Sequence, residues 1–219
     1  LAGGSTAYPE GPGLNIPVNM SVAFHSDAGC HPTDKLVGTF MFYTIKDDDK
    51  ETTYPSGGDR ICNRDFADFI QTQIVEDIRQ TMMPTWQKRH LMHQSMSETR
   101  NPKVPSTIIE LLSHHNYYDM TFGLDPKFKF IASRAIYKGM LRFIHQTTGT
   151  PYVVQPLPVQ QMNISYANND SLHITWAERV DRLEPTATPT YYIIYTRTSQ
   201  LRDGQWQTSD WDNGIRVTT

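Results

Sequence analysis

Several features are scarce in this chain of 219 residues, and each scarcity excludes a class of protein. The sequence contains no apolar run near the ~20 residues that a membrane-spanning helix needs. Basic residues do not exceed acidic ones, because 20 Lys and Arg are set against 23 Asp and Glu, and no basic cluster is interleaved with aromatic residues. We therefore expect neither a membrane span nor nucleic-acid binding.

Cysteine is equally scarce, with Cys30 and Cys62 as its two positions. Neither belongs to a pattern of two Cys-x-x-Cys or His-x-x-x-His pairs, so the sequence predicts no metal knuckle. A disulfide between Cys30 and Cys62 stays open, because such a bond depends on a Cα separation that sequence does not give.

Apolar periodicity over residues 1–150 predicts an α/β domain. Apolar residues recur at spacings of three and four from Phe66 to Ile78 and stop before Pro84, which predicts a helix with one buried face. A second helix is predicted from Asp125-Pro126, with Asp as its cap and Pro in its first turn. Because apolar runs alternate with these helices, we expect a mostly parallel sheet.

The composition changes near Gly149. Prolines at three positions of residues 151–158 predict a stiff linker, because proline fixes φ. Period-two alternation in residues 159–219, as in Leu172 to Trp176, predicts β-strands. A strand ending in Trp176 before a tyrosine-rich strand is similar to the fibronectin type III sandwich. We expect an incomplete all-β domain of this kind, with Trp176 in its core.

Two apolar runs end in residues of chemical interest. Val22 to Phe24 leads to His25, and Thr107 to Ile109 leads to Glu110. Active sites of α/β proteins lie at the carboxyl ends of strands. A neutral imidazole and a carboxylate at such an edge are what a zinc hydrolase needs to hold its metal and to move a proton.

Two longer strings resemble one enzyme family. FHSDAG at 24–29, with the apolar run that follows it, resembles a metal-ligand region of the zinc-dependent N-acetylmuramoyl-L-alanine amidases. STIIELLSHHNYYDM at 106–120, followed by DPKFKFIASRAIYKGMLRFI, resembles that family's closing strand and helix. The resemblance implies a three-layer α/β fold, His25 as a zinc ligand, Glu110 as the catalytic carboxylate and peptidoglycan as the substrate.

The same resemblance implies that part of the domain lies outside this chain. In the family, a first histidine and a glutamate precede the FHSDAG region and complete the zinc site. We therefore expect the remaining zinc ligands outside this sequence, and we expect activity of the full-length protein rather than of this chain alone. Within that family, the chain resembles Bacteroidetes proteins labelled xanthan lyases, in which fibronectin type III modules follow an amidase-like domain. They are secreted, periplasmic or at the cell surface.

Two further residues are candidates for substrate binding. Arg100 lies in a polar stretch before the Glu110 strand and offers a guanidinium fork to a carboxylate. His114 follows Glu110 closely and is a candidate to line the cleft, although a helix start nearby explains it equally well. The alternatives to an amidase are a cell-surface scaffold or carbohydrate-binding module with a degenerate amidase fold, and a polysaccharide lyase.

Overall fold

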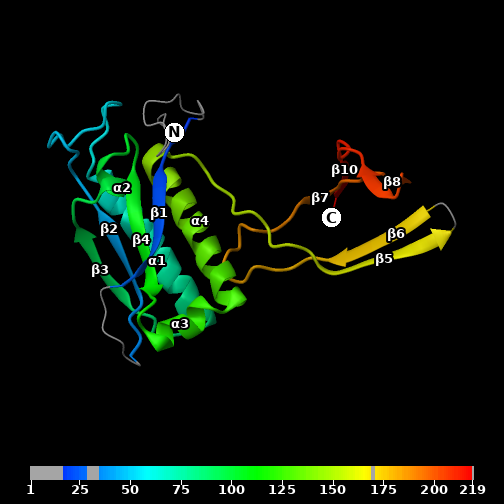
Figure 1. Cartoon of the computed structure of the whole chain (residues 1–219), viewed down its shortest axis with the longest axis horizontal. Helices are drawn as coiled ribbons and strands as arrows, with labels where there is room; N and C mark the ends of the chain where they lie inside the picture. The colour runs from blue at the N-terminus through cyan, green and yellow to red at the C-terminus, as the bar shows by residue number, and fades with distance from the viewer. Residues whose placement is uncertain (1–16, 29–34, 169–170, 219) are drawn as a thin grey trace. The chain divides into compact units, whose positions relative to one another are not determined.

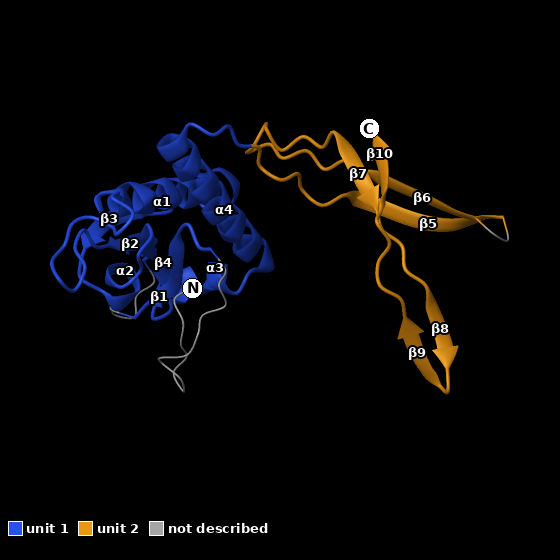
Figure 2. Cartoon of the chain, turned by 90° about the horizontal axis from the view of Figure 1, so that it is seen from above, with its two compact units in different colours: residues 1–152 blue, residues 153–219 orange. Residues whose placement is uncertain are grey.

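The structure is a computed structural model that describes residues 17–28, 35–168 and 171–218. It divides the chain into two compact units, Leu1–Tyr152 and Val153–Thr219, which Figure 2 shows in different colours. Cys30, one half of the disulfide left open above, lies outside the described residues. None of the described helices is both long and apolar enough to cross a membrane.

The first unit is built on a four-stranded sheet of order β1-β4-β2-β3. β1 pairs with β4 and β2 pairs with β3 in parallel, whereas β2 and β4 are antiparallel. The α/β class is confirmed, but the sheet is mixed rather than mostly parallel. Apolar runs mark buried strands without giving their direction, so the sequence pattern could not show this. The strands are β1 (Ser21–Asp27), β2 (Thr39–Tyr43), β3 (Lys88–His93) and β4 (Ser106–Ser113).

Two long helices cover one face of this sheet, as Figure 1 shows: α1 (Cys62–Thr81) and α4 (Pro126–Thr148). Both were predicted from apolar spacing. Asp125 caps α4 by accepting a hydrogen bond from the Lys127 amide, as expected. The helices enclose the main core with the inward side chains of β2 and β4. Met41 of β2, Ile109 of β4 and Phe128 of α4 are fully buried there.

The opposite face of the sheet is covered more thinly. A small cluster of Phe40, Phe42 and Ile108 lies there, and the short helix α2 (Ser97–Arg100) packs close to β4. The described part of the unit therefore has two full layers and one short helix in place of the expected third layer. A seven-residue helix, α3 (Tyr117–Gly123), follows β4 and precedes α4.

The second unit consists of three separate two-stranded antiparallel sheets in its described part. Trp176 is only partly buried, and its ring packs edge to face against the Tyr192 ring, with 5.2 Å between the ring centres. Strands were predicted correctly here, whereas the expected sandwich is not confirmed, because the described strands pair only two by two. The strands are β5 (Gln160–Asn168), β6 (Ser171–Ala177), β7 (Tyr191–Ile194), β8 (Ser199–Arg202), β9 (Gln205–Thr208) and β10 (Ile215–Thr218).

Candidate functional site

His25 and Glu110 are direct partners in the register of β1 and β4. The two strands are parallel neighbours, so their paired side chains leave the sheet on the same face. Nδ1 of His25 lies 3.8 Å from Oε1 of Glu110. Neither residue is at a strand end as predicted, because β1 continues to Asp27 and β4 continues to Ser113. The parallel pairing nevertheless brings together the two residues that the sequence singled out.

Glu110 is nearly buried, with 8% of its surface exposed. Burial raises the pKa of its carboxyl group above the ordinary value, and the nearby Asp27 raises that pKa further. His25, Arg89 and His114 act in the opposite direction on this pKa. Among the described residues, Oε2 of Glu110 has no hydrogen-bond partner. Glu110 is therefore a carboxylate with one oxygen beside an imidazole and the other available for a proton or ligand.

A second carboxylate contacts His25 from the opposite side of the ring. Oε1 of Glu98, on α2, lies 3.0 Å from Nε2 of His25. The side chains of both residues are roughly two-fifths exposed. Sequence reasoning did not select Glu98, because nothing in its polar surroundings distinguishes it from the charged residues nearby.

An ion pair of Asp27 and Arg89 borders the same site. Nη1 of Arg89 lies 2.7 Å from Oδ2 of Asp27, and its guanidinium lies 4.2 Å from the centre of the Phe40 ring. Phe40 is the register partner of Glu110 across β2 and β4, so the cation occupies the face that carries Glu110. Arg89 belongs to the polar stretch before the Glu110 strand, in which no strand was predicted, and the structure places it on the edge strand β3.

The two predicted substrate-binding residues lie in different surroundings. Nδ1 of His114 is hydrogen-bonded to Oγ of Ser26 at 2.9 Å, and Ser26 directly follows His25 in the chain. Arg100, at the end of α2, forms an ion pair with Asp48 and donates a hydrogen bond to Oγ of Ser95 at 3.0 Å. The structure thus brings His114 beside the site, whereas the Arg100 guanidinium is engaged by its own neighbours.

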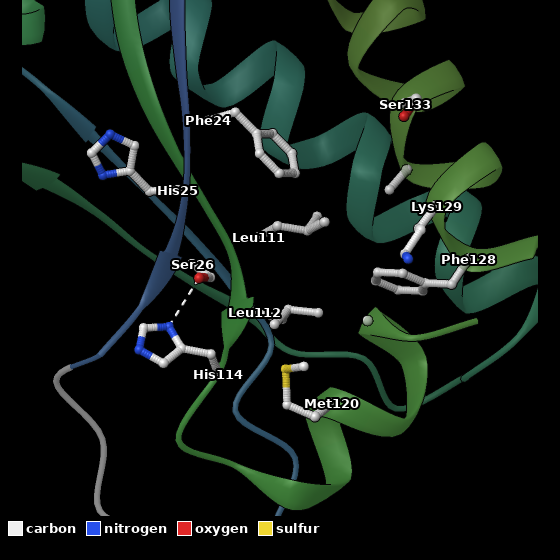
Figure 3. Close-up of a pocket in the computed structure, with 12 residues that line it drawn as sticks. Phe24, His25, Ser26, Leu111, Leu112, His114, Met120, Phe128, Lys129 and Ser133 are labelled. Carbon is white, nitrogen blue, oxygen red and sulfur yellow. Dashed lines mark hydrogen bonds between the residues drawn. The ribbon is translucent and has the colours of Figure 1, made fainter. Parts of the chain in front are cut away.

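Two hollows adjoin these residues. One, of about 410 Å³, opens between β1, β4 and α4, and Figure 3 shows its apolar floor of Leu111, Leu112 and Phe128. His25 lines its margin, but the imidazole ring points away from that floor. The second, of about 580 Å³, is lined by Ala23, Glu98 and the segment after α2. Ala23 and His25 share a face of β1, so this second hollow adjoins the His25–Glu98 contact.

The described residues fit a zinc ion in part. His25 offers an imidazole nitrogen, which is a preferred zinc donor, and carboxylates lie on both sides of it. Zinc sites use three or four protein ligands. Across residues 17–28, 35–168 and 171–218, no group of three or more His, Cys, Asp or Glu is arranged to hold a metal. His25 fits the metal by its chemistry, but the described part of the chain does not supply a full ligand set.

The sequence matches no protein-family model and no curated protein. Among solved structures, the chain is similar to an N-acetylmuramoyl-L-alanine amidase from Clostridium difficile 630, with 15% identity, a TM-score of 0.46 and coverage of 60% of each chain. The CwlD amidase from Clostridioides difficile, solved with the GerS lipoprotein, is 20% identical, with a TM-score of 0.45 and coverage of 60% of this chain and 57% of that one. AmiC2 of Nostoc punctiforme is 16% identical, with a TM-score of 0.45 and 58% of each chain covered. The chain thus spans about three-fifths of the length of these structures.

Proposed function

We propose that the Leu1–Tyr152 unit belongs to a zinc-dependent amide hydrolase that acts on peptidoglycan at the cell envelope. The bond cleaved is the amide between the muramoyl lactyl group and L-alanine. The observation that carries the proposal is the register pairing of His25 with the buried Glu110. The substrate follows from the resemblance of the two strings around these residues to the amidase family.

Glu110 serves as the general base in this proposal. A carboxyl group whose pKa is raised toward neutrality accepts a proton from water more effectively than an ordinary, fully solvated one. Glu110 takes a proton from the attacking water and delivers it to the leaving amine of alanine. Its burial also limits the access of bulk water to the reacting atoms.

His25 serves as one zinc ligand, and the remaining ligands lie outside the described residues. Zinc bound there supplies a Lewis acid that polarises the amide carbonyl and lowers the pKa of a bound water. His114 and Arg100 remain the proposed contacts for the peptide part of the substrate. The Arg100 guanidinium has to exchange its partner Asp48 for a substrate carboxylate, whereas His114 is already exposed beside Ser26.

Glu110→Gln tests the enzyme directly. The purified full-length protein, supplied with zinc, is incubated with peptidoglycan, and newly released alanine amino groups are labelled and quantified. General acid–base catalysis contributes roughly 10²- to 10⁴-fold, and we expect a loss of release in that range. Glu76→Gln, on the exposed side of α1, is the matched control and should retain wild-type release. Equal release by Glu110→Gln and wild type would refute the assignment of Glu110.

A second candidate function is a binding scaffold with a degenerate amidase fold. The observation that favours it is the lack of a three-ligand group among the described residues. A scaffold should bind peptidoglycan without releasing amino groups, and Glu110→Gln should leave that binding unchanged. The zinc content of the dialysed protein, measured by elemental mass spectrometry, distinguishes the enzyme from the scaffold, since only the enzyme requires about one zinc per chain. The lyase alternative predicts an unsaturated sugar as product instead of a free amine.

A further inference from the structure

α2 holds Glu98 against His25 although it is only four residues long. Thr99, directly after Glu98, is fully buried, and its Oγ1 is hydrogen-bonded to Oγ1 of Thr44 at 2.7 Å. Oγ of Ser106, the first residue of β4, donates to the Thr99 carbonyl at 2.9 Å. Glu98 thus extends from a helix fixed to the strand that carries Glu110, and its position is set by the fold.

A buried arginine fixes the other end of α2. Arg60 donates hydrogen bonds to the carbonyl oxygens of Arg100 at 3.2 Å and of Pro102 at 3.3 Å, and its side chain is fully buried. Tyr54 covers the guanidinium, whose central carbon lies 4.5 Å from the centre of the Tyr54 ring. The backbone that follows Glu98, from Thr99 to Pro102, is therefore held by hydrogen bonds to buried side chains. Such a backbone restricts the positions open to the Glu98 carboxylate.

The contact between Glu98 and His25 determines which ring nitrogen carries hydrogen. A carboxylate only accepts hydrogen bonds, so Nε2 of His25, 3.0 Å from Glu98, has to be the donor. A neutral imidazole has one N–H, and the lone pair is then on Nδ1. Nδ1 is the nitrogen that faces Glu110, at 3.8 Å. Metal-binding histidines commonly donate their other N–H to a carboxylate in this way, which fixes both tautomer and ring orientation.

We propose that Glu98 is a positioning residue that holds His25 in the Nε2–H tautomer, with the lone pair of Nδ1 directed toward the Glu110 side. The use of that lone pair for zinc rests on the proposed function. The tautomer itself does not, because it follows from the contacts of the protein without metal. Glu98 and His25 are both partly exposed, so their contact adds little to folding stability. Its effect is on the orientation of the ring.

Nuclear magnetic resonance of the metal-free chain tests the tautomer. The full chain is labelled with ¹⁵N in histidine, and long-range ¹H–¹⁵N correlations are recorded at a pH at which imidazoles are neutral. His25→Asn identifies the His25 signals by their loss. We expect wild type to show the Nε2–H pattern, and Glu98→Gln to weaken that preference, because an amide can donate to the ring nitrogen as well as accept from it. Glu98→Leu should shift His25 to a mixture of tautomers, whereas Glu76→Leu should not.

Either of two results in this experiment would overturn the proposal. The first is an Nδ1–H tautomer of His25 in the wild-type chain. The second is an unchanged His25 pattern in Glu98→Leu. Far-ultraviolet circular dichroism checks that the variants are folded, and the partly exposed Glu98 makes loss of folding unexpected.

Zinc affinity in the full-length protein gives an independent measurement, by competition with a chelator of known affinity. Loss of a carboxylate that orients a metal-binding histidine costs about 10- to 100-fold in affinity, which we expect for Glu98→Leu. Glu98→Gln should lose less affinity than Glu98→Leu, because its amide oxygen can still accept the Nε2–H, and unchanged affinity in Glu98→Leu contradicts the proposal. A protein that binds zinc in this Glu98-dependent way without cleaving peptidoglycan refutes the proposed function alone. If the protein cleaves peptidoglycan but the tautomer of His25 is the same with and without Glu98, only the positioning role of Glu98 is refuted.

Discussion

Arg89, on the edge strand β3, reaches Asp27, on the opposite edge strand β1, with 2.7 Å between Nη1 and Oδ2. The guanidinium passes over the ring of Phe40, and Gln71 of α1 fixes the Arg89 backbone by donating to its carbonyl at 2.8 Å. Asp27 is in turn joined to β4, because its carbonyl accepts hydrogen bonds from Ser113 Oγ and from the His114 amide. The pair therefore links both edges of the sheet across the face that carries Glu110.

Arg89→Met should destabilise the protein and raise the pKa of Glu110. The variant leaves the carboxylate of Asp27, which is 9% exposed, without its cation. Loss of one partner of a buried ion pair costs about 3–5 kcal/mol, and we expect about 2–3 kcal/mol because Arg89 is partly exposed. Arg89 also lowers the pKa of Glu110, so that pKa should rise in the variant. Urea denaturation measures the first effect.

The matched control for Arg89→Met is Arg64→Met. Arg64 also pairs with an aspartate, Asp65, but both side chains are more than half exposed. Exposed pairs contribute about 0–1 kcal/mol, so this variant should unfold close to wild type. A similar small loss in both variants would show that the Arg89–Asp27 link contributes no more than an ordinary surface pair.

The sequence could predict His25 and Glu110 because each follows an apolar run long enough to mark a buried strand. His25 and Glu110 lie together only because β1 and β4 pair in parallel. The order and length of the two strands in the sequence allowed this pairing but did not establish it. Glu98 and Arg89 could not be predicted as neighbours of this site. Their segment has no apolar periodicity, and their positions depend on the packing of α2 and on the reach of a long side chain across the sheet.

The long helices were the most predictable part of the fold. Spacings of three and four reveal a buried face whatever the tertiary partner, and the Asp125-Pro126 start is a local signal. The edge strand β3 was not predicted. Its side chains are exposed or only partly buried, so they leave no apolar pattern, and its pairing with β2 is made by backbone hydrogen bonds that the sequence does not reveal. The antiparallel pairing of β2 with β4 was missed because connections between strands, rather than their residues, determine direction.

Lys138 of α4 and Asp77 of α1 form a buried ion pair, with 2.7 Å between Nζ and Oδ2. Lys138→Met should cost about 3 kcal/mol or more, since it leaves the buried carboxyl group of Asp77 without the lysine that pairs with it. Asp77→Asn should also destabilise, because it leaves the ammonium unpaired. The double variant should recover much of the loss, since the asparagine amide still offers an oxygen to Gln73, which donates to Asp77 at 2.8 Å in the wild type. Denaturation of all four proteins gives the coupling energy, and simple additivity would contradict the expectation.

The Lys138→Met variant should also respond to acid in a defined direction. Burial raises the pKa of Asp77, and Lys138 opposes that rise, so the pKa should be higher still without the lysine. A carboxyl group with a raised folded-state pKa penalises folding above that pKa and stops doing so once it is protonated. The difference in unfolding free energy between wild type and variant should therefore shrink as the pH falls toward ~4. A constant difference across this range would show that Asp77 is not the group responsible.

Tyr54 should make the protein sensitive to alkali. Burial is the main cause that raises its pKa to about 12 from the ordinary 10.0, and its hydroxyl donates to Asn63 at 2.6 Å. The folded state therefore keeps a proton that the unfolded state loses, so stability is full below pH 10 and falls between about pH 10 and 12. Two pKa units correspond to about 3 kcal/mol.

Tyr54→Phe isolates this effect. The variant should lose about 1 kcal/mol at neutral pH with the hydrogen bond to Asn63, but its stability should decline less between about pH 10 and 12. Wild type and variant should therefore converge as the pH rises. Tyr117→Phe, at a position that is 77% exposed, is the control and should follow wild type. Parallel curves for wild type and Tyr54→Phe would show that another group governs alkaline unfolding.

Gly38 precedes β2 at a place where a side chain has no room. Its φ is +81°, and a Cβ there would lie 2.4 Å from the carbonyl oxygen of Gln87. That oxygen accepts the Thr39 amide at 3.0 Å, so Gly38→Ala has to displace the contact that joins the starts of β2 and β3. We expect a loss of about 3 kcal/mol, made up of ~1 kcal/mol for the left-handed backbone and the remainder for the displacement.

Gly149→Ala separates the two contributions to that loss. Gly149 ends α4 with φ +70°, but nothing lies within 4 Å of a Cβ built on it, so this variant should lose only the ~1 kcal/mol of the backbone conformation. Because β2 carries Phe40, the register partner of Glu110, Gly38→Ala should also reduce the amidase activity proposed above, whereas Gly149→Ala should not. Equal losses of stability in the two variants would mean that the contact with Gln87 yields at no cost.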